Sequence, residues 1–114
     1  MKTIQKYSDF SNFMALDLRV GQVLEAESLP NARKPAFKML VDFGELGVKK
    51  TSAQITERYS VNELIGRQVI AVVNFPPKQI GGFMSECLVL GGLTNDGVAL
   101  LGIDSPAGNG DRIA

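Results

Sequence analysis

Residues 16–23 read Leu-Asp-Leu-Arg-Val-Gly-Gln-Val, and their apolar side chains at first alternate with polar ones. A two-residue period is typical of a strand with one buried face, so this segment predicts a β-strand. Gly21 interrupts the alternation, and apolar spacing resumes out of phase at Val23. A glycine at such a phase change predicts a bulge or a sharp bend, which strongly curved sheets require.

Further strands are predicted along the chain from alternating or continuous apolar runs. Gly44–Gly47 predicts a tight reversal between two of them, and Asn95-Asp96-Gly97 is a strong signal for a hairpin turn. The additional predicted strands span residues 37–43, 48–53, 69–73, 88–90 and 98–103.

Two short helices are predicted, over residues 9–14 and 56–64, and Gly66 closes the second. The order is therefore a helix, three strands, a helical connection and at least two more strands. Composition alone indicates only a small all-β barrel or sandwich, but this order is that of the OB arrangement, a five-stranded and partly open barrel. The sequence contains no internal repeat and no linker, so residues 1–114 are expected to form one domain.

The overall charge argues against a dedicated nucleic-acid binder. Twelve Lys and Arg residues balance twelve Asp and Glu residues, which gives a formal net charge of zero at pH 7. Nucleic-acid-binding domains usually carry a basic excess, so a bound polyanion would need a local basic patch. The alternative to such a patch is that the basic side chains are spread over the surface and simply solvated. The candidates for the patch are Arg33, Lys34, Lys38, Lys49, Lys50, Arg58 and Lys78.

The residues that most often carry catalysis and bind metals are scarce. Histidine is absent and Cys87 is the single cysteine, so no intrachain disulfide can form. Zinc sites draw mainly on Cys and His, and no phosphate-binding glycine loop precedes a helix, so neither a metal nor a cofactor is expected. Cys87 lies in an apolar strand and is expected to be a core residue. No apolar run reaches the about 20 residues that span a bilayer. We expect a non-enzymatic, cytoplasmic protein without membrane insertion.

Three segments resemble one protein family. Residues 18–23 are similar to the opening strand of the tRNA-binding OB domains, which are appended to methionyl-tRNA synthetases and to the phenylalanyl enzyme's β chain and also occur alone. Residues 50–55 are similar to the segment that follows the third strand of those domains. Residues 74–86, Asn-Phe-Pro-Pro-Lys-Gln-Ile-Gly-Gly-Phe-Met-Ser-Glu, resemble the family's loop in the version carried by CsaA-type secretion chaperones. The likeness covers residues 9–114.

Two departures separate this chain from the tRNA-binding members. Those members tend to have consecutive basic residues after the prolines, whereas here Lys78 is followed by Gln79. They usually continue Ser-x-Gly-Met, whereas residues 85–88 read Ser-Glu-Cys-Leu. The resemblance therefore implies an export chaperone that binds unfolded or precursor proteins and helps deliver them to the Sec machinery. The same family implies the alternatives, a structure-specific tRNA- or RNA-binding protein or a synthetase-associated module.

The segment 74–86 has the composition of a rigid, ligand-presenting loop. Pro76-Pro77 fixes two φ angles and removes two donors, and Gly81-Gly82 permits backbone conformations closed to other residues. Loops on rigid scaffolds often carry function, although such a segment could equally be a connection that merely closes the barrel. The side chains expected to contact a peptide or tRNA are those of Lys38, Lys50, Ser52, Gln54, Asn74, Lys78, Phe83, Met84, Ser85 and Glu86.

These candidates offer two kinds of contact. Phe83 and Met84 would grip apolar segments, and the flexible thioether of methionine suits promiscuous recognition. Asn74, Ser85 and the polar pair Ser52 and Gln54 could bond a ligand's backbone, or they could satisfy the loop's own amides. The sequence leaves these alternatives open.

An apolar surplus at both ends of the chain predicts a homodimer. Surface of this kind favours association, and a two-fold pair is the commonest solution. Pairing through the N-terminal segment and the C-terminal strands is also what the resemblance implies. Two binding sites on one particle would add avidity for an extended polypeptide. The surplus residues are Phe10, Phe13, Met14, Leu100, Leu101 and Ile103.

Overall fold

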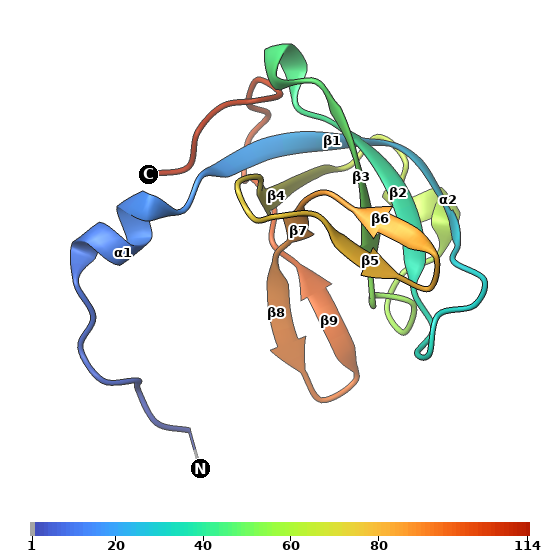
Figure 1. Ribbon diagram of the computed structural model, residues 1–114, viewed down its shortest axis with the longest axis horizontal. Helices are drawn as coiled ribbons and strands as arrows, with labels where there is room; N and C mark the ends of the chain where they lie inside the picture. Colours follow the sequence, from blue (N-terminus) through green and yellow to red (C-terminus); the bar gives the residue numbers. More distant parts are fainter. Residues whose placement is uncertain (1) are drawn as a thin grey trace.

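The computed structural model describes residues 2–114, and its main feature is an antiparallel sheet that curls into a nearly closed barrel (Figure 1). The barrel strands are β1 (Leu18–Ser28), β2 (Phe37–Asp42), β3 (Val48–Ala53), β4 (Gln68–Val72) and β7 (Leu88–Val89). Their order across the sheet is β3-β2-β1-β4-β7, with a short helix between β3 and β4 along the chain. This arrangement confirms the predicted OB fold.

Two short helices and two β-hairpins are attached to the barrel. They are α1 (Phe10–Ala15), α2 (Val61–Leu64), the hairpin of β5 (Lys78–Ile80) and β6 (Phe83–Ser85), and the hairpin of β8 (Gly91–Thr94) and β9 (Gly97–Leu100). The β8–β9 hairpin turns where predicted, but it forms a ribbon separate from the barrel sheet (Figure 1). The helix predicted over 56–64 is shorter than expected. Residues 56–58 form a turn, and α2 starts only after Ser60, which makes a capping box with Glu63.

The phase change in β1 arises because the strand buries first one face and then the other. Leu18 and Val20 are buried with two residues of β4 outside the barrel, whereas Val23 is buried in the barrel interior. Gly21 lies between these two parts of the strand. The side chains of Val41 in β2 and Phe43 just after it pack against Gly21 and leave no room for a Cβ. The predicted bulge at Gly21 was wrong in position: the register of β1 with β2 shifts at Leu24.

The C-terminal segment after β9 covers the outer cluster of β1 and β4. Ile103, Ala107 and Ile113 pack against that cluster, and Ile113 N–H donates to Leu18 O at 2.8 Å. The strand predicted to continue through this region ends at Leu100. Ile103 is therefore half-buried within its own chain and is not surplus surface, contrary to expectation.

Candidate binding site

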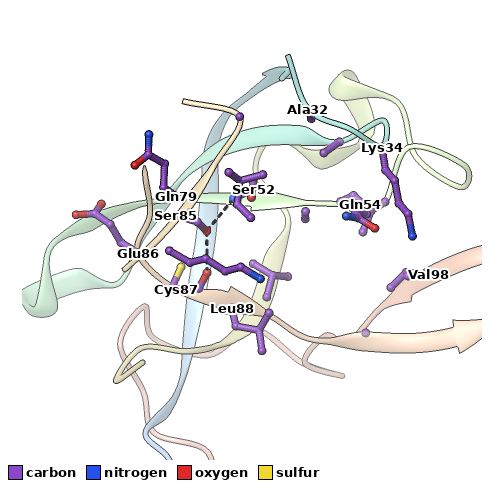
Figure 2. A pocket seen from close by; sticks show the side chains of 18 of the residues that line it. Ala32, Lys34, Ser52, Gln54, Gln79, Ser85, Glu86, Cys87, Leu88 and Val98 are labelled. Carbon is purple, nitrogen blue, oxygen red and sulfur yellow. Dashed lines mark hydrogen bonds between the residues drawn. The ribbon is translucent and has the colours of Figure 1, made fainter. Parts of the chain in front are cut away.

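The barrel closes along a seam between β3 and the segment from β6 to β7, and side chains replace part of the missing ladder. Glu86 N–H donates to Lys50 O at 2.7 Å, and Lys50 N–H donates to the Glu86 carboxylate at 2.8 Å. Ser52 N–H donates to Ser85 Oγ at 3.1 Å (Figure 2). Four of the ten predicted site residues thus serve the seam itself: Lys50, Ser52, Ser85 and Glu86.

Thr51 and Cys87 form the buried layer of the seam. The Thr51 hydroxyl donates to the Cys87 carbonyl at 2.8 Å, and Thr51 is completely buried. Burial raises the pKa of the Cys87 thiol to about 11, and the Thr51 hydroxyl offsets this only in part. The thiol is therefore neutral near pH 7, and Cys87 is the core residue that the sequence predicted.

Beyond these contacts the two edges of the barrel separate and a cleft of about 1290 Å³ opens. Residues 52–55 line one side, and residues 85–91 line the other. Residues 31–34 and 78–81 complete its rim. Within residues 2–114, no hydrogen bond joins 53–55 to 88–91. The cleft is therefore an opening in the barrel wall.

Five of the ten predicted site residues line this cleft. Ser52 and Gln54 lie on the β3 side, Lys78 lies on β5, and Ser85 and Glu86 lie where the seam ends. Figure 2 shows Ser52 and Gln54 along one side of the opening.

The other five predicted residues, Asn74 among them, lie outside the cleft. Lys38, Lys50 and Phe83 line a separate, smaller cavity of about 270 Å³, and Met84 lines neither cavity. Lys38 Nζ pairs with Glu27 at 2.8 Å, and Lys50 Nζ lies 5.6 Å from the centre of the Phe83 ring. The predicted set therefore divides between two places on the barrel.

Asn74 has a structural use. Its amide oxygen accepts from Asp17 N–H at 2.9 Å, and its amide nitrogen donates to Ala15 O at 2.8 Å. These bonds fix the connection from α1 to β1 at the point where the chain leaves β4. Asn74 does not line the cleft.

Residues 74–86 form a hairpin and not the open loop that the prolines indicated. Gly81 and Gly82 make its turn with φ angles of +54° and +79°, a region that favours glycine. A Cβ on Gly81 would come within 2.9 Å of Asn31 O, so the glycine also lets the loop at 31–34 approach the hairpin.

The apolar wall of the cleft was not predicted. It includes Leu88, Leu93 and Val98, and Figure 2 shows Leu88 and Val98 across from Gln54. Leu93 and Val98 belong to the β8–β9 ribbon, whose position beside the barrel no local pattern reveals. Their one sequence signal is apolar side chains flanking a hairpin turn.

The cleft also carries a local positive charge in a chain that is neutral overall. Arg33, Lys34 and Lys78 line it, and none of them makes an ion pair within residues 2–114. Glu86 is the one acidic residue of the lining.

Comparison with known proteins identifies the family. Residues 18–112 match the family model described as "Putative tRNA binding domain". The chain belongs to this tRNA-binding domain family. Among solved structures, this family member is similar to chaperone CsaA from Bacillus anthracis, with a TM-score of 0.91 and 50% identity over 96% of this chain and 100% of that chain. It is also similar to the CsaA chaperone protein from Picrophilus torridus, with a TM-score of 0.90 and 49% identity over 95% of this chain and 100% of that chain.

The same domain occurs in much longer relatives. The methionine–tRNA ligase of Methanothrix thermoacetophila is 42% identical over 105 residues, which is 90% of this chain and 15% of the ligase. This chain therefore spans about 15% of that relative, and the match covers only the non-catalytic tRNA-binding domain. Among residues 2–114, no helix has the length and apolar character needed to cross a membrane.

Proposed function

We propose that this protein is a chaperone that binds unfolded or precursor polypeptides. The observation that carries the proposal is the open cleft at the barrel seam, which combines an apolar wall with free cationic side chains. Its volume of about 1290 Å³ exceeds the roughly 300–1,000 Å³ of small-molecule sites. A long polymer with apolar side chains fits such a surface better than a compact ligand does.

The proposed assembly is a homodimer. α1 has no buried residue, and Phe10 and Met14 are 73% and 49% exposed. Leu101 adds a further apolar side chain that is 48% exposed. Exposed apolar surface of this kind supports pairing of two copies, because its burial is the main driving force for association.

The cellular role follows from the CsaA likeness and belongs to the same proposal. We infer a single-domain, non-catalytic cytoplasmic protein that holds precursors before export and passes them to the Sec machinery. The likeness to two structures described as CsaA chaperones supports this role, since both are covered over their whole length.

A second candidate is tRNA binding, alone or beside a synthetase. The family description and the methionine–tRNA ligase relatives favour it. The smaller cavity adds a local reason, because Lys38, Lys50 and Phe83 line it together and Lys50 Nζ lies 5.6 Å from the centre of the Phe83 ring. An aromatic ring beside a cation is the kind of surface on which bases stack. The zero net charge weighs against strong binding of this kind.

One binding experiment separates the two functions. The purified protein is titrated with reduced, carboxymethylated α-lactalbumin, which cannot refold, and with total tRNA, each at low and at physiological salt. A chaperone binds the unfolded protein with a weak salt dependence, because apolar burial dominates. Tight tRNA binding that weakens steeply with salt, with no binding of the unfolded protein, would reverse the assignment.

A further inference from the structure

The edge of β3 continues past the seam with free backbone groups. Lys50 and Ser52 direct their amides away from β2, since Lys50 N–H reaches Glu86 and Ser52 N–H reaches Ser85. Alternate residues of a strand point their N–H and C=O to the same side. Gln54, two residues further along, therefore presents its backbone to the cleft that it lines.

The backbone of Gln54 lacks a hydrogen-bond partner within residues 2–114. The Ser52 carbonyl accepts only from its neighbour Thr51, at 3.4 Å. Gln54 is exposed, so water can satisfy its N–H and C=O until a ligand replaces it. An open strand edge of this kind is a template for pairing with another chain.

The opposite wall of the cleft, formed by β7, is also a strand edge with free backbone groups. Leu90 N–H donates to Ile70 O at 2.9 Å, which assigns Leu90 to the β4 side of β7. By alternation, the N–H and C=O of Val89 point away from β4, and Val89 also lines the cleft. Both sides of the cleft are thus edges of the barrel sheet, with space between them.

We propose that a client polypeptide binds in this cleft as an added β-strand on the edge formed by Ser52 and Gln54. The inference rests on the proposed polypeptide-binding function and specifies its mode of recognition. Main-chain hydrogen bonds supply affinity for any extended sequence, which suits a protein with many clients. Alternate side chains of the client then face the apolar wall at Leu88 and Val98.

The cationic rim selects among such clients. Arg33, Lys34 and Lys78 have no ion-pair partner within residues 2–114. The Glu86 carboxylate already accepts a hydrogen bond from the backbone N–H of Lys50. An extended segment that mixes apolar and acidic residues complements this rim. RNA offers phosphates to the rim but no repeating amide donors and acceptors for the strand edge, so polypeptide is favoured.

A backbone-methylation scan tests strand addition directly. The probe is a short capped peptide in which valine alternates with threonine and glutamate, and each amide is N-methylated in turn. Methylation on the side facing β3 is expected to weaken binding at least about tenfold, because it removes hydrogen bonds and blocks close approach. Methylation of the intervening amides is expected to leave the affinity within about twofold. Equal effects at every position would overturn strand addition.

A pair of protein variants gives an independent check. Gln54→Pro removes the backbone N–H that the client would use. Gln54→Ala also changes the side chain but keeps that backbone N–H. Only Gln54→Pro should lose peptide binding, and the Gln54 amide of the unaltered protein should become protected from hydrogen exchange when peptide is bound. Equal affinities of both variants, or an unprotected Gln54 amide, would contradict the proposal.

Comparing three ligands distinguishes failure of the strand-addition hypothesis from failure of the proposed polypeptide-binding function. Binding of carboxymethylated α-lactalbumin without binding of the alternating peptide would contradict strand addition but leave the polypeptide-binding function in place. Binding of tRNA with binding of neither the unfolded protein nor the peptide would overturn the chaperone proposal as well.

Discussion

Replacing Gly21 by alanine tests how the barrel packs under β1. A Cβ at this position would lie 2.5 Å from Val41 Cγ1 and 2.6 Å from Phe43 Cε1, whereas ordinary contacts begin at 3.4 Å. The neighbours would have to move by about 0.9 Å. Both are completely buried in the main cluster, so moving them disturbs the packing of the core around them. Overpacking of this kind costs about 2 kcal/mol.

Urea unfolding at a fixed protein concentration measures the effect. Small proteins have urea slopes of about 1–3 kcal/mol/M, so the Gly21→Ala midpoint should fall by about 1 M with an unchanged slope. Gly92→Ala is the matched control, because its added Cβ meets only Ala99 O at 3.9 Å, and its midpoint should stay near that of the wild type. A wild-type midpoint for Gly21→Ala would refute the close packing of β1 beneath Phe43.

Two further predictions concern the seam. Thr51→Val and Ser85→Ala should each cost about 1 kcal/mol in unfolding free energy, because the remaining hydroxyl still reaches the Cys87 carbonyl, at 3.3 Å from Ser85 and 2.8 Å from Thr51. The double variant orphans that carbonyl and should cost clearly more than the sum, so strict additivity in a double-mutant cycle would contradict the shared acceptor. Burial raises the Cys87 pKa from 9.0 to about 11, so the folded state holds more protons than the unfolded state between these values and stability falls as the pH rises through that window. Near pH 10 the loss relative to Cys87→Ala should be about 1 kcal/mol in urea unfolding, and a difference between the two proteins that does not change from about pH 8 to pH 10 would show that the thiol is not buried.

The strands with simple alternation could be predicted from sequence almost to the residue. The prediction for 37–43 matches β2, because alternate residues of that strand are buried in the core. The prediction for 48–53 matches β3, which was identified as the strand that returns after the reversal at residues 44–47. The phase change at Gly21 could not be interpreted locally. Its cause is the C-terminal segment, which covers the outer face of β1 and lies about 90 residues further along the chain.

The site was partly predictable for a similar reason. Ser52, Gln54 and Lys78 were identified from motifs, and the structure brings them to one cleft. The wall at Leu88 and Leu93 depends on where the β8–β9 ribbon lies, which is a tertiary property. The β5–β6 hairpin was missed although its Gly-Gly pair is a hairpin signal.

A matched pair of charge substitutions tests whether unfolded polypeptide binds in the cleft at the barrel seam. Leu88 lines the cleft and is 48% exposed, whereas Ile65 lies outside the cleft and is 50% exposed. Leu88→Asp and Ile65→Asp therefore add the same charge at the same exposure, and titration with carboxymethylated α-lactalbumin compares them. Leu88→Asp should weaken binding by about tenfold or more, the equivalent of losing one buried apolar contact, while Ile65→Asp should bind as the wild type does. Equal affinities for the two variants would show that unfolded polypeptide binds outside the cleft.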